Sequence, residues 1–418
     1  MPILFFHTVL GVDMSKKKDE SNVKIADFFA VQLEQKEQEV KDNAVVGIPL
    51  QAISLQYLFS NDVFPLGRMT ELVGVSESCK TAFLFEIFRW HVYNCTDSRQ
   101  FDPAGLHGGY IHNLAEPRDS PDLRASIMRL GSRNPFPVFK AACVEDWQKR
   151  CSDWIKRAEE MFEAGSMPYP VCLGQDSLTA VTTKNEMDAT WKQGYAEPSY
   201  AQIAKSINLW TKVFFPKMEP WPVSFVAVNH MKENKAPNGA IIRTIPGGAA
   251  LKYASTFMFR LQRKSDIELI GESGRIIEIV TEKNSLSPAN HEKLIVRMTW
   301  TYDEEGEQIT IWDWHDATIE LLISFDGSRK KRLMDIVPLE LVDKTRRTAD
   351  CAPLGLKKAS WSEIGTAIMQ DPQMVKELQL FFNIRKRYKF KLGVPYSIQQ
   401  AEANAIANKE KPPEEELS

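Results

Sequence analysis

The segment Met69-Thr-Glu-Leu-Val-Gly74-Val-Ser-Glu-Ser-Cys79-Lys80-Thr81 decides the predicted fold. Apolar, β-prone residues precede Gly74, and the helical pattern AFLFEIFRWHVYN follows Thr81. The segment closely follows the motif G-x-x-x-x-G-K-[ST], set between a strand and a helix as that motif requires. In such a loop, backbone amides and the helix N-terminus bind phosphate, the lysine reaches the β and γ oxygens, and the hydroxyl binds Mg²⁺. The segment therefore predicts a nucleotide site.

Cys79 is the departure from this motif, because the motif has glycine at its position. If the backbone there is left-handed, a side chain costs about 1–2 kcal/mol. A side chain would also narrow the path around the phosphate. The alternative interpretation is a Ser/Lys/Thr turn that caps a helix and binds no nucleotide.

The end of another predicted strand favours the interpretation that the chain has a nucleotide site. The stretch Pro170-Val-Cys-Leu-Gly-Gln-Asp176-Ser177 is mostly apolar and reaches an aspartate about 95 residues after Thr81. A carboxylate at that strand end can hold Mg²⁺ through water, and the serine after it can sense phosphate. An isolated aspartate of this kind more often forms a turn or a helix cap. Its pairing with the phosphate loop favours the functional interpretation.

Composition excludes several classes of protein. The 418 residues suit two or three domains, and 43% hydrophobic with 26% charged residues excludes a disordered or collagenous chain. No stretch approaches the roughly 18–20 apolar residues of a membrane helix. The six cysteines lack metal-ligand spacing, which predicts reduced thiols in a cytoplasmic protein. The N-terminal apolar run has no basic residue before it, so we expect no signal peptide, and Met14 is an alternative start to Met1.

The order of strands and helices predicts an α/β protein. From about 46 to 324, the strand-like runs MTELVGV, GGYIHNL, PVCLGQDS and PVSFVAVNH alternate with helical patterns. Such alternation predicts a mainly parallel sheet with helices on both faces. The later runs RIIEIVTE, LIVRMTW and QITIWDW follow at shorter spacing and predict antiparallel strands.

A third segment runs from Val228-Asn-His through a basic loop to Gly247-Gly-Ala-Ala-Leu-Lys-Tyr-Ala-Ser255. It resembles the RecA family of recombinases, in which a strand ending in Asn-Gln or Asn-His leads into a DNA-binding loop closed by Gly-Gly-x-Ala-Leu-Lys. The run Gly67-Arg-Met-Thr-Glu71 and the Asp-Ser pair described above also match that family. These motifs cover about residues 46–300, and the resemblance is greatest to phage-encoded recombinases of the UvsX kind.

The resemblance implies a three-part organisation. Residues 46–324 would form a RecA-like ATPase core, with DNA-binding loops at about 185–199 and 231–248. Residues 1–45 would hold a polymerisation helix, since the polar stretch 21–42 has apolar residues that a lone helix cannot bury. Residues 325–418 would form a small basic domain that ends in an acidic, disordered tail. The plainer interpretation of this tail is that it only keeps the protein soluble.

The resemblance also implies the nucleotide site. The residues assigned to ATP are those of the phosphate loop and the second strand end, namely Gly74, Val75, Ser76, Glu77, Ser78, Cys79, Lys80, Thr81, Asp176 and Ser177. Thr81 and Asp176 would serve Mg²⁺.

Catalysis would depend on Lys80 and three further residues. Glu116 is the nearest match to the glutamate that activates water in the family, although it lies about two residues later than the family's spacing requires. The alternative interpretation is that Glu116 is an ordinary solvated glutamate in a loop. His230 would sense the γ-phosphate, or else be an ordinary strand-end histidine. Lys283 approximates one of two basic residues that reach a neighbouring protomer's nucleotide.

DNA binding is predicted from cations, aromatic residues and glycines in the two loops and near the C-terminus. In the first loop, Trp191 and Lys192 would contact single-stranded DNA, with packing as the alternative for the tryptophan. The second-loop residues are Lys232, Lys235, Arg243, Gly247 and Gly248. The C-terminal residues, which suit duplex DNA, are Arg385, Lys386, Arg387 and Lys389.

Together these features predict an ATP- and Mg²⁺-dependent recombinase that forms a helical homo-oligomeric filament on single-stranded DNA and exchanges strands with a duplex. Single-strand-binding and loader proteins would be its partners, and the cytoplasm its location, that of the bacterial host if the gene is a phage's. Two alternatives remain open. One is a RecA-fold accessory or filament protein with weak or no ATP hydrolysis, and the other is a RecA-fold helicase or motor.

Overall fold

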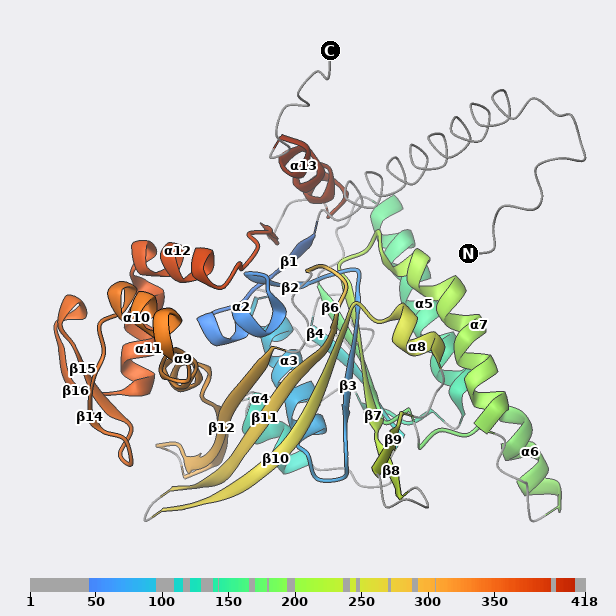
Figure 1. The fold of residues 1–418 in the computed structure, drawn as a ribbon. Helices are drawn as coiled ribbons and strands as arrows, with labels where there is room; N and C mark the ends of the chain where they lie inside the picture. The colour runs from blue at the N-terminus through green and yellow to red at the C-terminus, as the bar shows by residue number, and fades with distance from the viewer. Residues whose placement is uncertain are drawn as a thin grey trace, which may run out of the picture. The chain divides into compact units, whose positions relative to one another are not determined.

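In the computed structural model, residues 45–400 form one unit that is built on a mixed β-sheet (Figure 1). The structure describes residues 45–94, 109–115, 121–128, 138–141, 143–164, 170–178, 180–193, 200–235, 241–245, 249–269, 272–287, 292–304, 306–391 and 396–409. Among the described residues, 401–409 belong to a separate unit. The nine described strands of the sheet are, in spatial order, β13 Gln308–Trp312, β12 Lys293–Tyr302, β11 Glu272–Asn284, β10 Phe257–Leu269, β3 Met69–Gly74, β7 Val223–His230, β6 Val171–Asp176, β4 Gly109–Leu114 and β5 Val138–Phe139.

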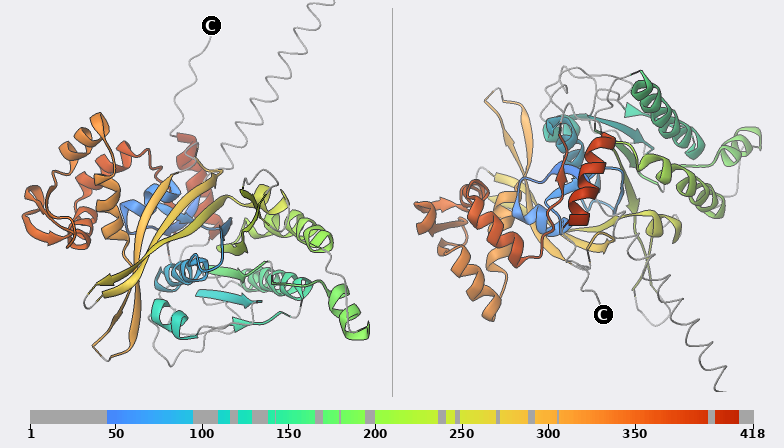
Figure 2. Two further views of the ribbon diagram at one scale, coloured as in Figure 1. Left: turned by 60° about the horizontal axis from the view of Figure 1, so that its bottom comes forward. Right: turned by 90° about the horizontal axis from the view of Figure 1, so that it is seen from above.

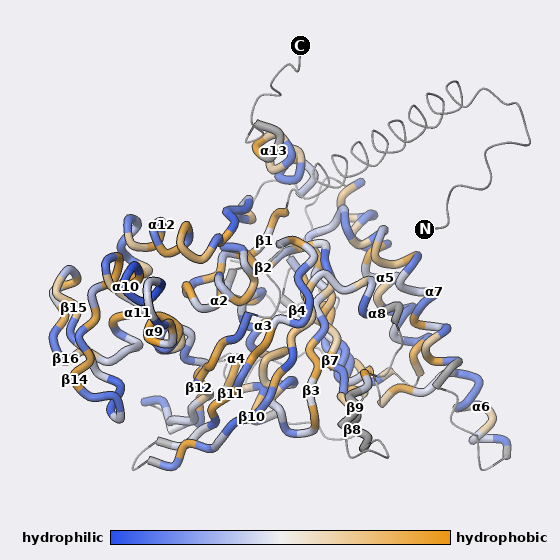
Figure 3. The backbone as a smooth tube through the Cα atoms, viewed as in Figure 1, coloured by the Kyte–Doolittle hydropathy of each residue, from blue (hydrophilic) through white to orange (hydrophobic). Residues whose placement is uncertain are grey.

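The sheet has a parallel half and an antiparallel half. Strands β10, β3, β7, β6, β4 and β5 pair in parallel, whereas β10, β11, β12 and β13 pair antiparallel. The parallel strands β3 and β6 are buried throughout, which accounts for their nearly continuous apolar sequence. Figure 3 shows the same apolar character along β7. The α/β class and the change from parallel to antiparallel strands are therefore confirmed.

Helices cover both faces of the parallel half (Figures 1 and 2). Alternate residues of β6 face opposite sides: Leu173 joins the core beneath α5 and α7, whereas Gly174 faces α3. A Cβ atom on Gly174 would lie 2.3 Å from the Phe88 ring, so only glycine permits this approach. The helices that flank the sheet are α3 Lys80–Asn94, α4 Pro121–Met128, α5 Val144–Glu163, α7 Tyr200–Met218 and α8 Ala249–Ala254. Helix α6 (Lys184–Gln193) lies beyond the end of α7, away from the sheet (Figure 1).

A small second sheet joins the start of the described chain to residues near its end. Strand β1 (Val46–Pro49) pairs antiparallel with β2 (Val63–Pro65) and parallel with β17 (Tyr388–Lys389). Helix α2 (Ile53–Phe59) lies between β1 and β2 in sequence and is buried along its whole length. The chain after residue 384 therefore returns to the elements that open the described part of the chain.

The C-terminal elements are helical around a three-stranded sheet. Trp361 is fully buried, and the guanidinium of Arg347 lies 3.9 Å from the centre of its ring. Arg347 also donates two hydrogen bonds, of 2.7 and 2.6 Å, to Asp316, which fixes the sheet to α9. These elements are α9 Trp314–Ile323, α10 Gly327–Ile336, β14 Glu340–Asp343, β15 Thr348–Cys351, the 3₁₀ turn Ala352–Leu354, β16 Leu356–Ser360, α11 Trp361–Gln370 and α12 Pro372–Phe381. A further helix, α13, spans Tyr396–Lys409.

Each helix in the described part of the chain is too short or too polar to cross a lipid bilayer.

Candidate nucleotide-binding site

The loop between β3 and α3 is built around a close approach at Gly74. A Cβ atom on Gly74 would lie 2.4 Å from the Ser78 hydroxyl and 2.5 Å from the carbonyl oxygen of Leu261. The loop therefore folds tightly back over the end of β3, beside β10. This requirement for glycine explains the first invariant position of the phosphate-loop motif in this chain.

Lys80 lies across this loop. Its ammonium donates hydrogen bonds to the Val75 carbonyl oxygen at 2.6 Å and to the Ser78 hydroxyl at 3.2 Å. The residue is only 4% exposed, so the loop and the first turn of α3 enclose the charge. An ammonium held inside a loop of backbone amides is arranged to contact a bound phosphate.

Thr81 and Asp176 are brought together although they are far apart in sequence. The Thr81 hydroxyl donates a 2.7 Å hydrogen bond to Oδ2 of Asp176, at the end of β6. The part of the chain that the structure describes holds no cluster of three His, Cys, Asp or Glu residues suited to a metal ion. One hydroxyl and one carboxylate fit Mg²⁺, which commonly takes few protein ligands and completes its shell with phosphate oxygens and water.

Cys79 adopts the left-handed conformation that the motif requires, with φ of 65°, and Glu77 does so too, with φ of 62°. The sulfur of Cys79 lies 3.5 Å from Nη1 of Arg275 and 3.9 Å from the Glu77 carbonyl oxygen. Burial raises the pKa of the Cys79 thiol, and hydrogen bonding from Arg275 opposes this. The side chain is thus directed toward β11, whereas Lys80 contacts Val75 and Ser78 within the loop.

The end of β7 lies beside the phosphate loop. His230 is the register partner of Gly74, and the next amide, of Met231, donates a 2.9 Å hydrogen bond to the Gly74 carbonyl. One residue earlier, the Asn229 side chain donates a 3.0 Å hydrogen bond to Glu71. Burial raises the pKa of Glu71, and this hydrogen bond opposes the effect. The strand end assigned to phosphate sensing is therefore tied to the loop by its backbone.

Lys283 has a local role in the structure. Its ammonium donates to the carbonyl oxygens of Lys252 at 2.6 Å, Tyr253 at 3.1 Å and Ser255 at 2.5 Å, which cap the C-terminal end of α8. Burial lowers the pKa of Lys283, and the charge of Glu71 opposes this. Contact with a neighbouring protomer's nucleotide stays a prediction, and it would require the ammonium to leave these carbonyls.

Several predicted residues lie outside the described part of the chain. These are Glu116, Gly247 and Gly248, together with the 21–42 stretch and the acidic residues from Glu410 onward. The amide of Ala115, at the end of β4, donates a 2.7 Å hydrogen bond to the Asp176 carbonyl. The chain that leads to Glu116 therefore starts from the Mg²⁺-binding candidate.

The described parts of the two predicted DNA loops include regular structure. In the second loop, β8 (Lys232–Lys235) pairs antiparallel with β9 (Ile241–Thr244), a hairpin that the sequence pattern did not predict. The backbone of Arg243 lies opposite Glu233 in this hairpin. In the first loop, Trp191 and Lys192 occupy α6, and the tryptophan is 91% exposed. That exposure favours stacking with a base over internal packing.

The C-terminal cations divide into two kinds. Arg385 donates a 3.1 Å hydrogen bond to the Leu286 carbonyl, and Arg387 donates a 2.8 Å hydrogen bond to Asn61. These arginines fasten the returning chain to the core. Arg385, Lys386 and Lys389 are exposed, and the two lysines remain the stronger candidates for DNA phosphates because the Arg385 guanidinium is already bonded to the core.

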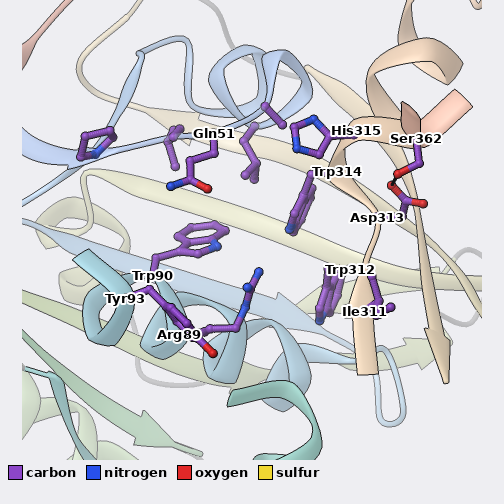
Figure 4. Close-up of a pocket in the computed structure, with 14 residues that line it drawn as sticks. Gln51, Arg89, Trp90, Tyr93, Ile311, Trp312, Asp313, Trp314, His315 and Ser362 are labelled. Carbon is purple, nitrogen blue, oxygen red and sulfur yellow. Dashed lines mark hydrogen bonds between the residues drawn. The ribbon is translucent and has the colours of Figure 1, made fainter. Parts of the chain in front are cut away.

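A cavity of about 470 Å³ lies apart from these residues, between α2, α3, the end of β13 and the start of α9 (Figure 4). Gln51, Arg89, Trp90 and Trp314 contribute to its walls, and no predicted site residue does. The buried Glu86 carboxylate accepts hydrogen bonds from Arg89 and from the indoles of both tryptophans. This wall is therefore a hydrogen-bonded junction between α3 and α9.

The fold is thus α/β, with a large mixed sheet flanked by helices, and the chain is similar in sequence to two curated proteins. They are Protein RecA of Aquifex pyrophilus and Protein RecA of Aquifex aeolicus (strain VF5). Each is 22% identical over 245 residues, which is 58% of this chain and 62% of the relative's length. No known protein-family profile matches the chain. The similarity supports a distant relationship to RecA and nothing finer.

Proposed function

We propose that this protein is an ATP-dependent DNA recombinase that forms filaments on single-stranded DNA and catalyses homologous pairing and strand exchange. The observation that carries the proposal is the contact between Thr81 and Asp176 beside the enclosed Lys80 ammonium. Two residues predicted for one Mg²⁺–nucleotide site from separate motifs meet at 2.7 Å. The distant similarity to RecA proteins supports the same function.

The chemistry proposed for the site is phosphoryl transfer to water. Loop amides and Lys80 would hold the ATP phosphates, and Thr81 and Asp176 would hold Mg²⁺, which neutralises charge on the β and γ oxygens. Glu116 would orient the attacking water and accept its proton. Most of the rate gain in such reactions comes from positioning and charge stabilisation.

Coupling between nucleotide and DNA is proposed to run through β7. His230 ends this strand next to Gly74, and two residues later the chain enters the β8–β9 hairpin. A change at the γ-phosphate could therefore alter the hairpin through one short stretch of backbone. Single-stranded DNA would be contacted there by Lys232, Lys235, Arg243, Gly247 and Gly248. Trp191 and Lys192 would contact the same DNA from the first loop.

The assembly is also part of the proposal. Residues 1–45 would dock on a neighbouring protomer, and the C-terminal cations would capture duplex DNA. Single-strand-binding and loader proteins would act as partners, in the cytoplasm of a bacterial host for a phage-encoded, UvsX-like recombinase.

One observation favours a second candidate, a RecA-fold filament protein that binds DNA with little hydrolysis. Cys79 takes a left-handed conformation that favours glycine, which costs the loop about 1–2 kcal/mol. Negative-stain imaging with single-stranded DNA and a non-hydrolysable ATP analogue tests the filament shared by both candidates. Regular filaments that need both ligands are expected. Filaments of the same length without nucleotide would contradict ATP-dependent assembly.

Replacing Lys232, Lys235 and Arg243 together with alanine should weaken binding to single-stranded DNA and flatten its salt dependence. Each lost phosphate contact removes about 0.7 from the log–log slope, so about 2 is expected for the three. Fluorescence anisotropy over a salt series measures this slope. The matched control, Lys386→Ala with Lys389→Ala, should change duplex binding and leave the single-strand slope intact. Equal effects of the two variants on both DNA forms would contradict the proposed division.

A further inference from the structure

The phosphate loop contains two non-glycine residues in the left-handed region, Glu77 and Cys79. Such residues disfavour the conformation they occupy, so the rest of the structure must hold them there. Each of the two contacts one arginine from the long β10–β11 hairpin. Nη1 of Arg263 lies 3.5 Å from Glu77, and Nη1 of Arg275 lies 3.5 Å from the sulfur of Cys79.

The two arginines are joined by Asp266. Asp266 and Arg275 are register partners across β10 and β11, and the Arg275 Nε lies 3.9 Å from the Asp266 carboxylate. Arg263 forms a second ion pair with the same carboxylate. Arg275 also lies over the Trp300 ring of β12, 5.6 Å from its centre. Arg263, Asp266 and Arg275, hereafter the hairpin clamp, are therefore oriented by the sheet rather than by the loop.

The hairpin is also close enough to act on the loop. The Leu261 carbonyl of β10 would lie 2.5 Å from a Cβ atom on Gly74, so strand and loop are in direct contact. The two arms of the clamp differ in strength. Glu77 has a side chain 76% exposed, and exposed ion pairs contribute little. Cys79 is 8% exposed, so its contact with Arg275 is the stronger arm.

We propose that Arg275, assisted by Arg263 through Asp266, is a positioning residue that holds the phosphate loop in its binding conformation in place of the missing glycine. The inference rests on the proposed nucleotide site. It names residues that no motif in the sequence indicates, because the arginines lie about 200 residues beyond the loop. It also explains how a loop with cysteine in this position keeps the geometry of a phosphate-binding loop.

A double-mutant cycle tests the clamp. ATP affinity is measured by isothermal titration for the wild type, Arg275→Gln, Cys79→Gly and the double variant. If the clamp compensates for the cysteine, Arg275→Gln weakens ATP binding roughly 5- to 30-fold in the wild-type background. This range corresponds to the free-energy cost of holding one non-glycine residue in the left-handed conformation. In the Cys79→Gly background the same substitution changes affinity less than about twofold. Equal losses in both backgrounds overturn the proposal.

Arg260→Gln is the matched control, because Arg260 lies in the same hairpin and pairs with Glu282 at 2.5 Å. We expect it to leave ATP affinity unchanged. Arg275→Lys keeps the positive charge and should bind ATP more tightly than Arg275→Gln does. The melting temperature of each arginine variant shows whether the substitution has destabilised the fold. A loss of ATP affinity for Arg260→Gln equal to that for Arg275→Gln would overturn the specific role of Arg275.

A second readout needs no nucleotide and so separates the clamp from the proposed function. The alkylation rate of Cys79 is followed by mass spectrometry of its peptide, without ATP. Because Arg275 also lowers the pKa of the Cys79 thiol, the rate is measured over a pH series and expressed per thiolate. Arg275→Gln should release the sulfur and raise this per-thiolate rate, while Arg260→Gln should not. An unchanged rate for Arg275→Gln overturns the clamp. Accelerated alkylation of Arg275→Gln, together with a wild type that binds no ATP, would instead support the clamp and refute the nucleotide site.

Discussion

Lys80→Ala should weaken ATP binding by at least about 30-fold and abolish ATP-dependent filament formation. The Lys80 ammonium is enclosed by the loop and donates hydrogen bonds to the Val75 carbonyl and the Ser78 hydroxyl. Removing one partner of a buried, hydrogen-bonded charge pair typically costs about 2–5 kcal/mol, which corresponds to this loss of affinity. Titration with a fluorescent ATP analogue measures the affinity, and negative-stain imaging measures the filaments.

The control for this variant is Lys357→Ala, which removes an exposed lysine of β16. It should bind ATP as the wild type does. Circular dichroism should show that both variants remain folded, since alanine is a good helix former at the first position of α3. Unchanged nucleotide affinity in a folded Lys80→Ala variant would show that ATP binds elsewhere.

The folded state should lose as much as about 4 kcal/mol of stability between pH 7 and pH 5. His91 and His112 are fully buried, and burial lowers their pKa values to about 4 and about 3, from an ordinary value of 6.5. Below pH 6.5 the unfolded chain therefore binds protons that the folded chain does not. Each pH unit below 6.5 costs about 1.4 kcal/mol for each histidine, until the folded-state pKa is reached.

Urea unfolding at several pH values, followed by circular dichroism, measures this loss. Burial raises the pKa values of Glu71 and Asp62, which acts in the opposite direction as the pH falls. The comparison that isolates the histidines is therefore with His112→Leu. His112 lies among the rings of Phe85 and Phe88, and its ring nitrogens have no hydrogen-bond partner among the described residues. The leucine variant should be more stable at pH 5 and lose about half of the pH dependence; an identical pH slope would contradict this account.

The sequence predicted the elements whose signals are local. Runs such as MTELVGV and PVCLGQDS are apolar because both faces of a parallel strand are buried, and those strands occur as predicted. The meeting of Thr81 and Asp176 was predictable for a related reason, since parallel strands end at one edge of a sheet. The motif left the backbone conformation at Cys79 open, and the structure shows that it is left-handed.

Other features depend on tertiary contacts that leave no local pattern. Nothing in the spacing of Arg275 indicates that it contacts Cys79, because the two meet only through sheet order. The cluster at 385–389 looks uniform as a sequence of cations, yet Arg387 bonds to Asn61 of the core while Lys389 is exposed. The β8–β9 hairpin is similarly hidden, because its polar residues lack the alternation typical of a strand.

The rate of ATP hydrolysis with and without single-stranded DNA tests the central claim most directly. The proposed site joins Lys80, Thr81 and Asp176 to a strand end that leads into the β8–β9 hairpin. We therefore expect the wild type to hydrolyse ATP slowly alone and much faster with single-stranded DNA, with Mg²⁺ required and Lys80→Ala inactive. A protein that binds ATP and DNA but shows no hydrolysis stimulated by single-stranded DNA would contradict the account, and the filament protein without useful hydrolysis would then be the better description.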